Sequence, residues 1–169
     1  FVQRGEIGTV RQLALFGFDL SRYKGMTLTG DCQMSMGVSW AGKEALFTLY
    51  EITKPWQEAT VTWDALVGAN GDHADVLGAA LDTQMVGPVE GTPVVYSWRI
   101  PQATAQRWLN APETFYGIAA VAQQNYVAHH LLTRNNGKRA RAPRLLLPVA
   151  QEERLHEEAQ KLVSTISAQ

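Results

Sequence analysis

The sequence predicts an all-β sandwich of two antiparallel sheets around one hydrophobic core. Most of the chain divides into short runs rich in β-branched and aromatic residues, separated by Gly, Pro, Asn and Asp. Its 169 residues, 46% of them hydrophobic, are enough for one domain with a core of ordinary size. Many short strands with polar turns favour a sandwich over a parallel sheet. The expected strands cover residues 11–20, 31–38, 45–52, 60–63, 93–100, 115–122, 126–133 and 144–149.

Residues 101–109 have the pattern of a short helix. The segment begins with a proline, which is favoured in the first turn of a helix. Ala105, Trp108 and Leu109 then fall on one face at helical spacing. We expect this helix to plug one end of the sandwich.

Residues 151–167 have the pattern of a second helix of different character. Seventeen residues make a marginal helix alone in water, so this helix needs a surface to dock on. We expect it to dock on its own sandwich, with self-association or contact with a following domain as alternatives. The chain therefore divides into a module, residues 1–149, and a helix or linker, residues 150–169. The apolar seam consists of Leu155, Ala159, Leu162 and Ile166.

Residues 64–91 read as a long, weakly patterned connection, and loops of this length are often functional. Asp72 and Asp75 lie there on either side of His73 and are weak candidates for a calcium site. A solvated polar loop is the favoured alternative. We expect no other cofactor.

The cysteine count and the length of the apolar runs limit the kinds of site and the location that we expect for the protein. Cys32 is the single cysteine, which excludes an internal disulfide and a thiolate metal cluster, and we expect it to be buried. No signal peptide is present, and no apolar run is long enough to insert into a membrane. We therefore expect the chain to be one module of a larger protein.

No common catalytic motif is present: the chain lacks a GxSxG elbow, an HExxH pair, a Walker loop and a GxGxxG turn. Glu51, Glu58 and Asp64 are the only cluster that could supply paired carboxylates for acid–base chemistry. Carboxylates at strand ends are common, so we expect no enzymatic activity.

His129 and Trp40 are the aromatic candidates for binding. His129 and His130 are adjacent in an expected strand, so one should face the core and the other solvent. Trp40 is expected in a turn close to Lys43, where it could stack on a sugar or cap the core. The other four tryptophans are expected in the core: Trp56, Trp63, Trp98 and Trp108.

A basic segment near the end of the module is the strongest electrostatic signal. No Asp or Glu occurs between Thr114 and Gln151, although the net charge of the chain is only -1. The segment should create a positive local field that attracts acidic polysaccharides, phosphates or an acidic protein face. Nucleic acid is not expected, because the pI is about 6.5 and exposed aromatics are not interleaved with the cations. The cations are Arg134, Lys138, Arg139, Arg141 and Arg144.

Motifs over residues 1–149 resemble the DNRLRE-domain family. Residues 11–21 (RQLALFGFDLS) are similar to its opening strand, and residues 1–5 (FVQRG) to the segment before it. Residues 98–109, 115–121 and 132–147 resemble later elements of the family in the right order. Its most recognisable motif, W-x-E-x-x-V-T-W, is matched by Trp56, Glu58, Val61, Thr62 and Trp63.

This resemblance implies a jelly-roll sandwich from a secreted or cell-surface bacterial or archaeal protein. Some members of the family bind alginate, an acidic polysaccharide, without catalysing a reaction on it. The chain departs from the family at Arg99, Pro101 and Asn135, which lie at the plug helix and the last loop. Those departures put an inherited ligand in doubt but not the fold.

We therefore expect a non-catalytic, extracellular carbohydrate-binding module for an acidic polysaccharide such as alginate. The alternative is a structural or assembly module with no glycan ligand. The expected contacts are Arg134, Lys138, Arg139 and Arg141, with Trp40, Lys43 and His129 as weaker candidates.

Overall fold

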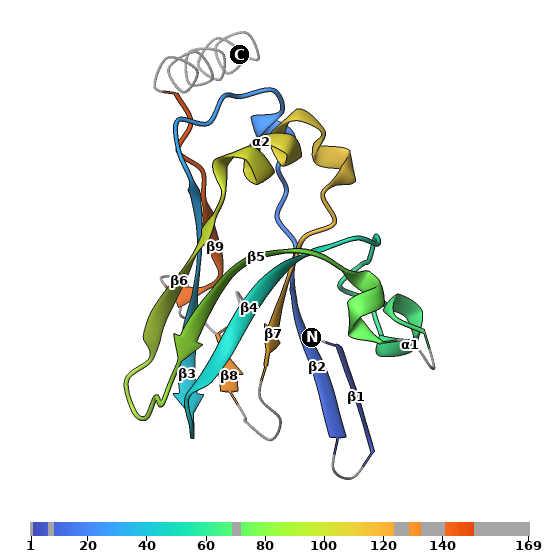
Figure 1. Cartoon of the computed structure of the whole chain (residues 1–169), viewed down its shortest axis with the longest axis vertical. Coiled ribbons are helices and arrows are strands. Elements are labelled where there is room, and N and C mark those ends of the chain that lie inside the picture. The colour runs from blue at the N-terminus through green and yellow to red at the C-terminus, as the bar shows by residue number, and fades with distance from the viewer. Residues whose placement is uncertain (1, 7–8, 69–71, 124–128, 133–140, 151–169) are drawn as a thin grey trace, which may run out of the picture.

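Two antiparallel sheets face each other in the computed structural model, which describes residues 2–6, 9–68, 72–123, 129–132 and 141–150 (Figure 1). The larger sheet has the strand order β1-β2-β7-β4-β5, and the smaller has the order β6-β3-β8, with β9 also paired to β3. The strands are β1 (Val2–Glu6), β2 (Thr9–Phe16), β3 (Cys32–Ala41), β4 (Ala45–Ile52), β5 (Leu77–Val86), β6 (Val94–Ile100), β7 (Ile118–Ala122), β8 (His129–Leu131) and β9 (Arg144–Leu146).

The predicted fold class, an all-β sandwich of two antiparallel sheets with a short helix, is confirmed. Strands far apart in the sequence interleave in both sheets, as in Greek-key sandwiches: β7 lies between β2 and β4, and β8 and β9 lie beside β3. The predicted C-terminal helix lies outside the described residues.

Two predictions about the chain between β4 and β6 were wrong. Residues 60–63 are not a strand, because the Thr62 hydroxyl accepts a hydrogen bond from the Ala65 amide (3.1 Å) and starts helix α1 (Trp63–Leu66). Residues 64–91 are not one long connection. They contain the 3-10 turn η2 (His73–Val76) and the ten-residue edge strand β5.

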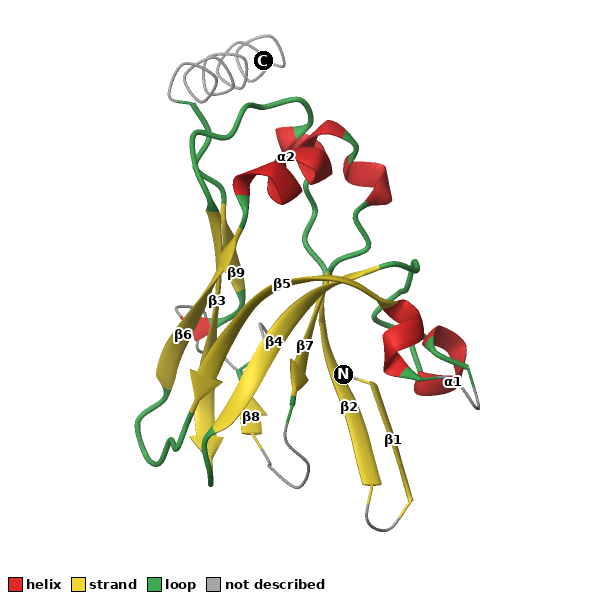
Figure 2. Cartoon of the chain, in the orientation of Figure 1, coloured by secondary structure: helices red, strands yellow, loops and turns green. Residues whose placement is uncertain are grey.

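The main core lies between the sheets and is closed at one end by helix α2 (Gln102–Asn110), as predicted (Figure 2). Ala105, Trp108 and Leu109 of α2 are all buried. The turn η1 (Ser21–Tyr23) follows β2, and η3 (Pro112–Thr114) follows α2. The loops that lead into β3 and β7 therefore lie at the same end of the sandwich.

A second hydrophobic cluster lies on the outer face of the larger sheet. Ala14 and Phe16 of β2 pack against the main core, so the alternate residues Leu13 and Leu15 face the other way. The segment between β4 and β5 covers them with Trp63, Leu66, Val67 and Val76. The larger sheet is therefore buried on both faces near β2.

Asp31 ties β3, β6 and α2 together at the plugged end. One carboxylate oxygen accepts the backbone amide of Gln102 at the start of α2 (2.8 Å), and the other accepts the Arg99 Nε–H (2.5 Å). These hydrogen bonds, from Arg99 first and then from Gln102, lower the pKa of Asp31 below its usual value of 3.8. The same ion pair raises the pKa of Arg99.

Because the pKa of Asp31 is lower in the folded chain, its stabilising effect is complete above about pH 4. This effect is lost as the pH falls through the lowered value. We expect Asp31→Asn to lower the urea midpoint at pH 6 but to have a smaller effect at pH 3. Glu44→Gln, which changes an exposed carboxylate in the hairpin between β3 and β4, is the matched control. An equal effect of Asp31→Asn at both pH values would contradict the lowered pKa of Asp31 in the folded chain.

Candidate functional site

An open pocket of about 330 Å³ lies where three distant segments of the chain meet. Gly17 and Phe18 follow β2, and Phe115, Tyr116 and Gly117 lie between η3 and β7. The third segment is the loop after β4. It contributes Pro55, Trp56 and Glu58.

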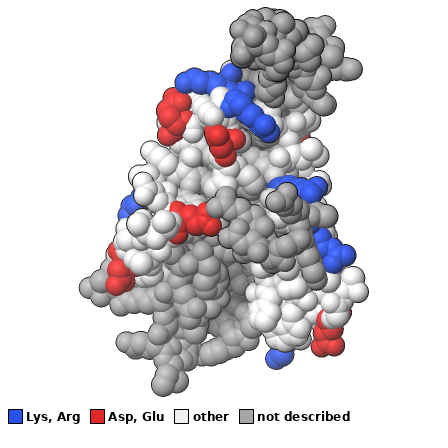
Figure 3. Space-filling model, turned by 180° about the vertical axis from the view of Figure 1, so that it is seen from behind, with Lys and Arg blue, Asp and Glu red and all other residues white. Residues whose placement is uncertain are grey.

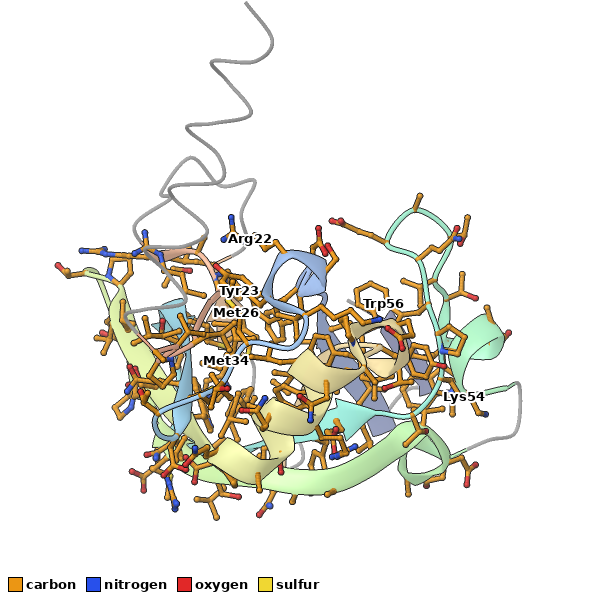
Figure 4. All side chains as sticks on the ribbon, turned by 90° about the horizontal axis from the view of Figure 1, so that it is seen from above. Arg22, Tyr23, Met26, Met34, Lys54 and Trp56 are labelled. Carbon is orange, nitrogen blue, oxygen red and sulfur yellow. The ribbon has the colours of Figure 1, made fainter. Side chains whose placement is uncertain are left out.

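Trp56 is fixed in place by its neighbours. Its indole Nε1–H donates to the Tyr116 carbonyl oxygen (2.6 Å). Gly17 lies against its ring, and a Cβ added there would be 3.6 Å from the ring. Figure 4, which views the molecule from above, labels Trp56. Because its polar atom is already satisfied, Trp56 offers the pocket an apolar ring rather than a hydrogen-bond donor.

The pocket lies between the two hydrophobic clusters. Phe18 and Phe115 pack against the main core, and Phe115 contacts the Trp108 ring with centroids 4.7 Å apart. Trp56 packs against the second cluster. Because each wall rests on a packed core, the pocket is formed before any ligand arrives.

Gly117 is the lining residue that leads directly into β7. Its backbone has a φ of +108°, and its carbonyl oxygen accepts the amide of Ile52 at the end of β4 (3.1 Å). A Cβ at this position would lie only 2.5 Å from the Phe16 carbonyl oxygen. Only glycine fits this conformation at this distance from the neighbouring backbone.

Four of the eight residues that line the pocket are aromatic, and Glu58 is the one that carries a carboxylate. No Lys or Arg belongs to the lining. Such a surface suits a ligand with apolar faces and hydroxyl groups, because rings stack on the faces and a carboxylate accepts hydrogen bonds from the hydroxyls.

Of the predicted basic contacts, Arg134, Lys138 and Arg139 lie outside the described residues. Arg141 lies beside the smaller sheet, where a Cβ added to Gly37 of β3 would meet the Arg141 carbonyl oxygen at 2.8 Å. On the face seen in Figure 3, the described Lys and Arg side chains lie in separate small groups. Arg141 is not a lining residue of the aromatic pocket.

Trp40 lies in β3 rather than in the turn predicted for it. Its side chain is 38% exposed and stacks on His130, with ring centroids 5.1 Å apart. The edge of its ring lies over Gly42, and Lys43 is exposed in the hairpin that follows. Trp40 is therefore a second exposed aromatic position, outside the pocket.

The two histidines of β8 face opposite sides, as predicted, and His129, the predicted ligand contact, is the inward one. His129 turns inward, where its ring meets Phe47 edge-on (centroids 4.8 Å apart) and its Nε2 lies 3.2 Å from the Val86 carbonyl oxygen. His130 is the exposed neighbour. Successive side chains of a strand point to opposite faces, so the two adjacent histidines differ in exposure.

The three carboxylates proposed for acid–base chemistry have separate environments. Glu51 accepts hydrogen bonds from Trp108 Nε1 (2.5 Å) and Arg107 (2.8 Å), and its side chain is only 15% exposed. Glu58 lines the pocket, whereas Asp64 is exposed in the first turn of α1. Glu51 therefore holds α2 against β4.

Asp72 and Asp75 start η2 with a capping box. The Asp72 carboxylate accepts the Ala74 amide (3.1 Å), and the Asp75 carboxylate accepts the Asp72 amide (3.0 Å). His73 lies 3.1 Å from the Asp72 carboxylate. Among the residues that the structure describes, no three His, Cys, Asp or Glu side chains are grouped to hold a metal ion.

Cys32 is buried at the start of β3, as predicted. Burial first, and the charge of Asp31 second, raise the pKa of its thiol to about 11. The thiol is therefore protonated at neutral pH and packs as a small apolar side chain.

Comparison with known proteins gives no matching family model, and no curated protein matches the chain. The resemblance to the DNRLRE-domain family therefore stays a prediction from short motifs. No helix in the described parts of the chain is long and apolar enough to span a membrane.

Proposed function

We propose that this chain is a non-catalytic module that binds a polysaccharide, with the aromatic pocket as its main contact. The observation that carries the proposal is an open pocket walled by Phe18, Trp56, Phe115 and Tyr116 and supported by two packed cores. Secretion or display on a cell surface, beside other domains of a larger protein, belongs to the same proposal.

The energetics of the pocket favour sugar binding. A sugar ring has one or two faces of C–H groups, which can stack on the aromatic walls, and hydroxyls that need acceptors such as Glu58. Because Trp56 is already held by Tyr116 and Gly17, little side-chain freedom is lost when a ligand binds.

The arginine segment supplies the second part of the proposal. Arg134, Lys138, Arg139 and Arg141 would attract an acidic polysaccharide through screened charge pairs, each contributing about 0–1 kcal/mol. Binding through this segment should therefore depend on several cations and weaken with salt. Alginate remains the acidic ligand suggested by the family resemblance.

Affinity electrophoresis in gels that contain alginate, pectate, a sulfated glycan or a neutral β-glucan tests the proposal, at low and high salt. Gly17→Leu places a branched side chain against the Trp56 ring inside the pocket, and we expect it to weaken binding at least tenfold. Trp40→Ala is the matched control, because it removes an exposed tryptophan outside the pocket.

Migration unchanged by every glycan would refute the proposal and leave a structural role for the module. Retention lost with Trp40→Ala but kept with Gly17→Leu would place binding on the smaller sheet instead. Retention that falls with salt and with Arg134, Arg139 and Arg141 changed to Ala would support the contribution of the arginine segment.

A further inference from the structure

We propose that Trp40 and His130 form a second sugar-binding position, so that the chain holds two glycan segments at once. This second position rests on the proposed glycan-binding function and extends it from one contact to two. The two rings, which we call the aromatic pair, lie on the smaller sheet and do not line the pocket.

A register shift in β3, of the β-bulge type, turns Trp40 out of the core. Val38 of β3 is fully buried and pairs with Leu131 of β8. The next pair along the two strands is Trp40 with His130, so Ser39 is the extra residue. Without Ser39, Trp40 would have the inward orientation of Val38. The bulge instead leaves a large apolar ring 38% exposed, and bulges beside functional sites re-aim side chains in this way.

The neighbours of Trp40 hold its ring without using its polar atom. The Trp40 and His130 rings have centroids 5.1 Å apart and an interplanar angle of 43°. A Cβ added to Gly42 would lie only 3.0 Å from the Trp40 ring, so the glycine makes room for that ring. Within the described part of the chain, the Trp40 indole N–H donates to no acceptor, unlike that of Trp56. The aromatic pair therefore offers a ligand an apolar ring together with a hydrogen-bond donor.

A sugar unit suits this combination. The C–H face of a pyranose ring can stack on the exposed indole, and a hydroxyl can accept the indole N–H. The exposed imidazole of His130 adds ring nitrogens that donate or accept hydrogen bonds. Lys43 and Glu44 follow in the hairpin with opposite charges, so their charges exclude neither a neutral nor an acidic sugar.

The aromatic pair and the pocket lie at opposite ends of the sandwich. Strand β4 leads from the hairpin that follows Trp40 to the loop that contains Trp56 (Figure 1). Its eight residues span about 25 Å at the usual rise of a strand. A trisaccharide is too short to contact both sites, so each site would bind its own segment. On long polysaccharides the module would therefore cross-link two chains, or two distant parts of one chain.

Nuclear magnetic resonance of the indole N–H groups separates the two sites, because the five tryptophans give separate signals. The probes are trisaccharide fragments of the four glycans tested by electrophoresis. We expect at least one of them to shift the signals of both Trp40 and Trp56. The signal of Trp98, which is buried, should not move. Trp40→Phe and Trp56→Phe identify the two signals by their loss.

Gly17→Leu and Trp40→Ala test the two positions separately. Gly17→Leu should abolish the shift of the Trp56 signal and keep that of Trp40, whereas Trp40→Ala should keep the shift of Trp56. Turbidity of the protein mixed with long chains of the same glycan needs both sites, so either variant should lower it at least about tenfold. Met85→Ala, which removes a side chain of similar exposure (46%) from the larger sheet, should change neither readout.

The two sites differ in strength, because the aromatic pair has no surrounding walls such as those of the pocket. In the affinity gels, we expect Trp40→Ala to weaken retention only about twofold, against at least about tenfold for Gly17→Leu.

The outcomes distinguish a second sugar-binding position from the proposed function. A Trp56 shift without a Trp40 shift for every probe would overturn the second position and leave the pocket as the binding site. A Trp40 shift without a Trp56 shift would overturn the binding of two segments and move the main contact out of the pocket. No shift of either signal would overturn both proposals. Turbidity that survives Trp40→Ala would show that the aromatic pair does not cross-link chains, and would overturn the binding of two segments at once.

Discussion

Trp98→Ala is expected to lower the free energy of unfolding by about 3–5 kcal/mol. Trp98 lies in β6 and is 0% exposed, and Trp98 and Trp108 are the largest of the fully buried side chains among the described residues. Its Nε1–H crosses the sandwich and donates to the Phe47 carbonyl oxygen of β4 (3.0 Å). The substitution therefore opens a cavity and removes a hydrogen bond between the two sheets.

Urea unfolding followed by far-UV circular dichroism measures this effect. Trp98→Phe keeps much of the ring volume but loses the donor, so we expect a smaller loss of about 1–2 kcal/mol. Trp40→Ala, at a position that is 38% exposed, should cost less than about 1 kcal/mol. Equal losses for Trp98→Ala and Trp40→Ala would show that Trp98 does not join the sheets.

Strands that have one buried face and clear turn signals could be predicted from the sequence. The run ALFTLYEI became β4 with the predicted bounds, because Ala45, Phe47 and Leu49 alternate into the core and Gly, Lys and Glu precede them. The opposite orientations of His129 and His130 follow from the same period of two.

The strand β5 has no such pattern, so its sequence predicts a loop rather than a strand. It is an edge strand in which large apolar residues do not alternate with polar ones, and its pairing with β4 shifts register between Leu49 and Tyr50 and again before Ile52. Each shift changes which residues face the core, so no single alternation runs through the strand. Trp40 was misplaced at a similar irregularity, because the pairing of β3 with β8 shifts between Val38 and Trp40.

The pocket could not be derived from local patterns. Trp56 and Glu58 belong to the most recognisable motif, but we expected Trp56 in the core and assigned Glu58 no binding role. Phe18, Phe115 and Tyr116 lie in other stretches that resemble the family, and the sequence indicated no binding role for them. Their proximity depends on the pairing of β2 with β7, which joins segments about 100 residues apart in the chain. The positions that demand glycine are likewise visible only in the folded backbone.

Gly117→Ala is expected to cost at least about 3 kcal/mol of stability and to abolish glycan binding. Two separate penalties apply. The φ of +108° is strained for any residue with a Cβ, and the new Cβ would lie 2.5 Å from the Phe16 carbonyl oxygen and 3.3 Å from its carbon. Both neighbours are backbone atoms of β2, so no side-chain rotation can relieve the contact.

Gly25→Ala isolates the first penalty, because Gly25 also has a positive φ (+77°) but nothing lies within 4 Å of an added Cβ. We expect it to cost about 1–2 kcal/mol and to leave glycan binding unchanged. Urea unfolding and affinity electrophoresis on both variants measure the two effects. Moving Gly117 away from Phe16 also displaces Tyr116, whose carbonyl oxygen holds the Trp56 indole, so stability and binding should be lost together. If Gly117→Ala were no more destabilising than Gly25→Ala, the backbone of β2 at Phe16 would be able to move away from the new Cβ at little cost. The pocket would then be a flexible surface rather than a preformed site.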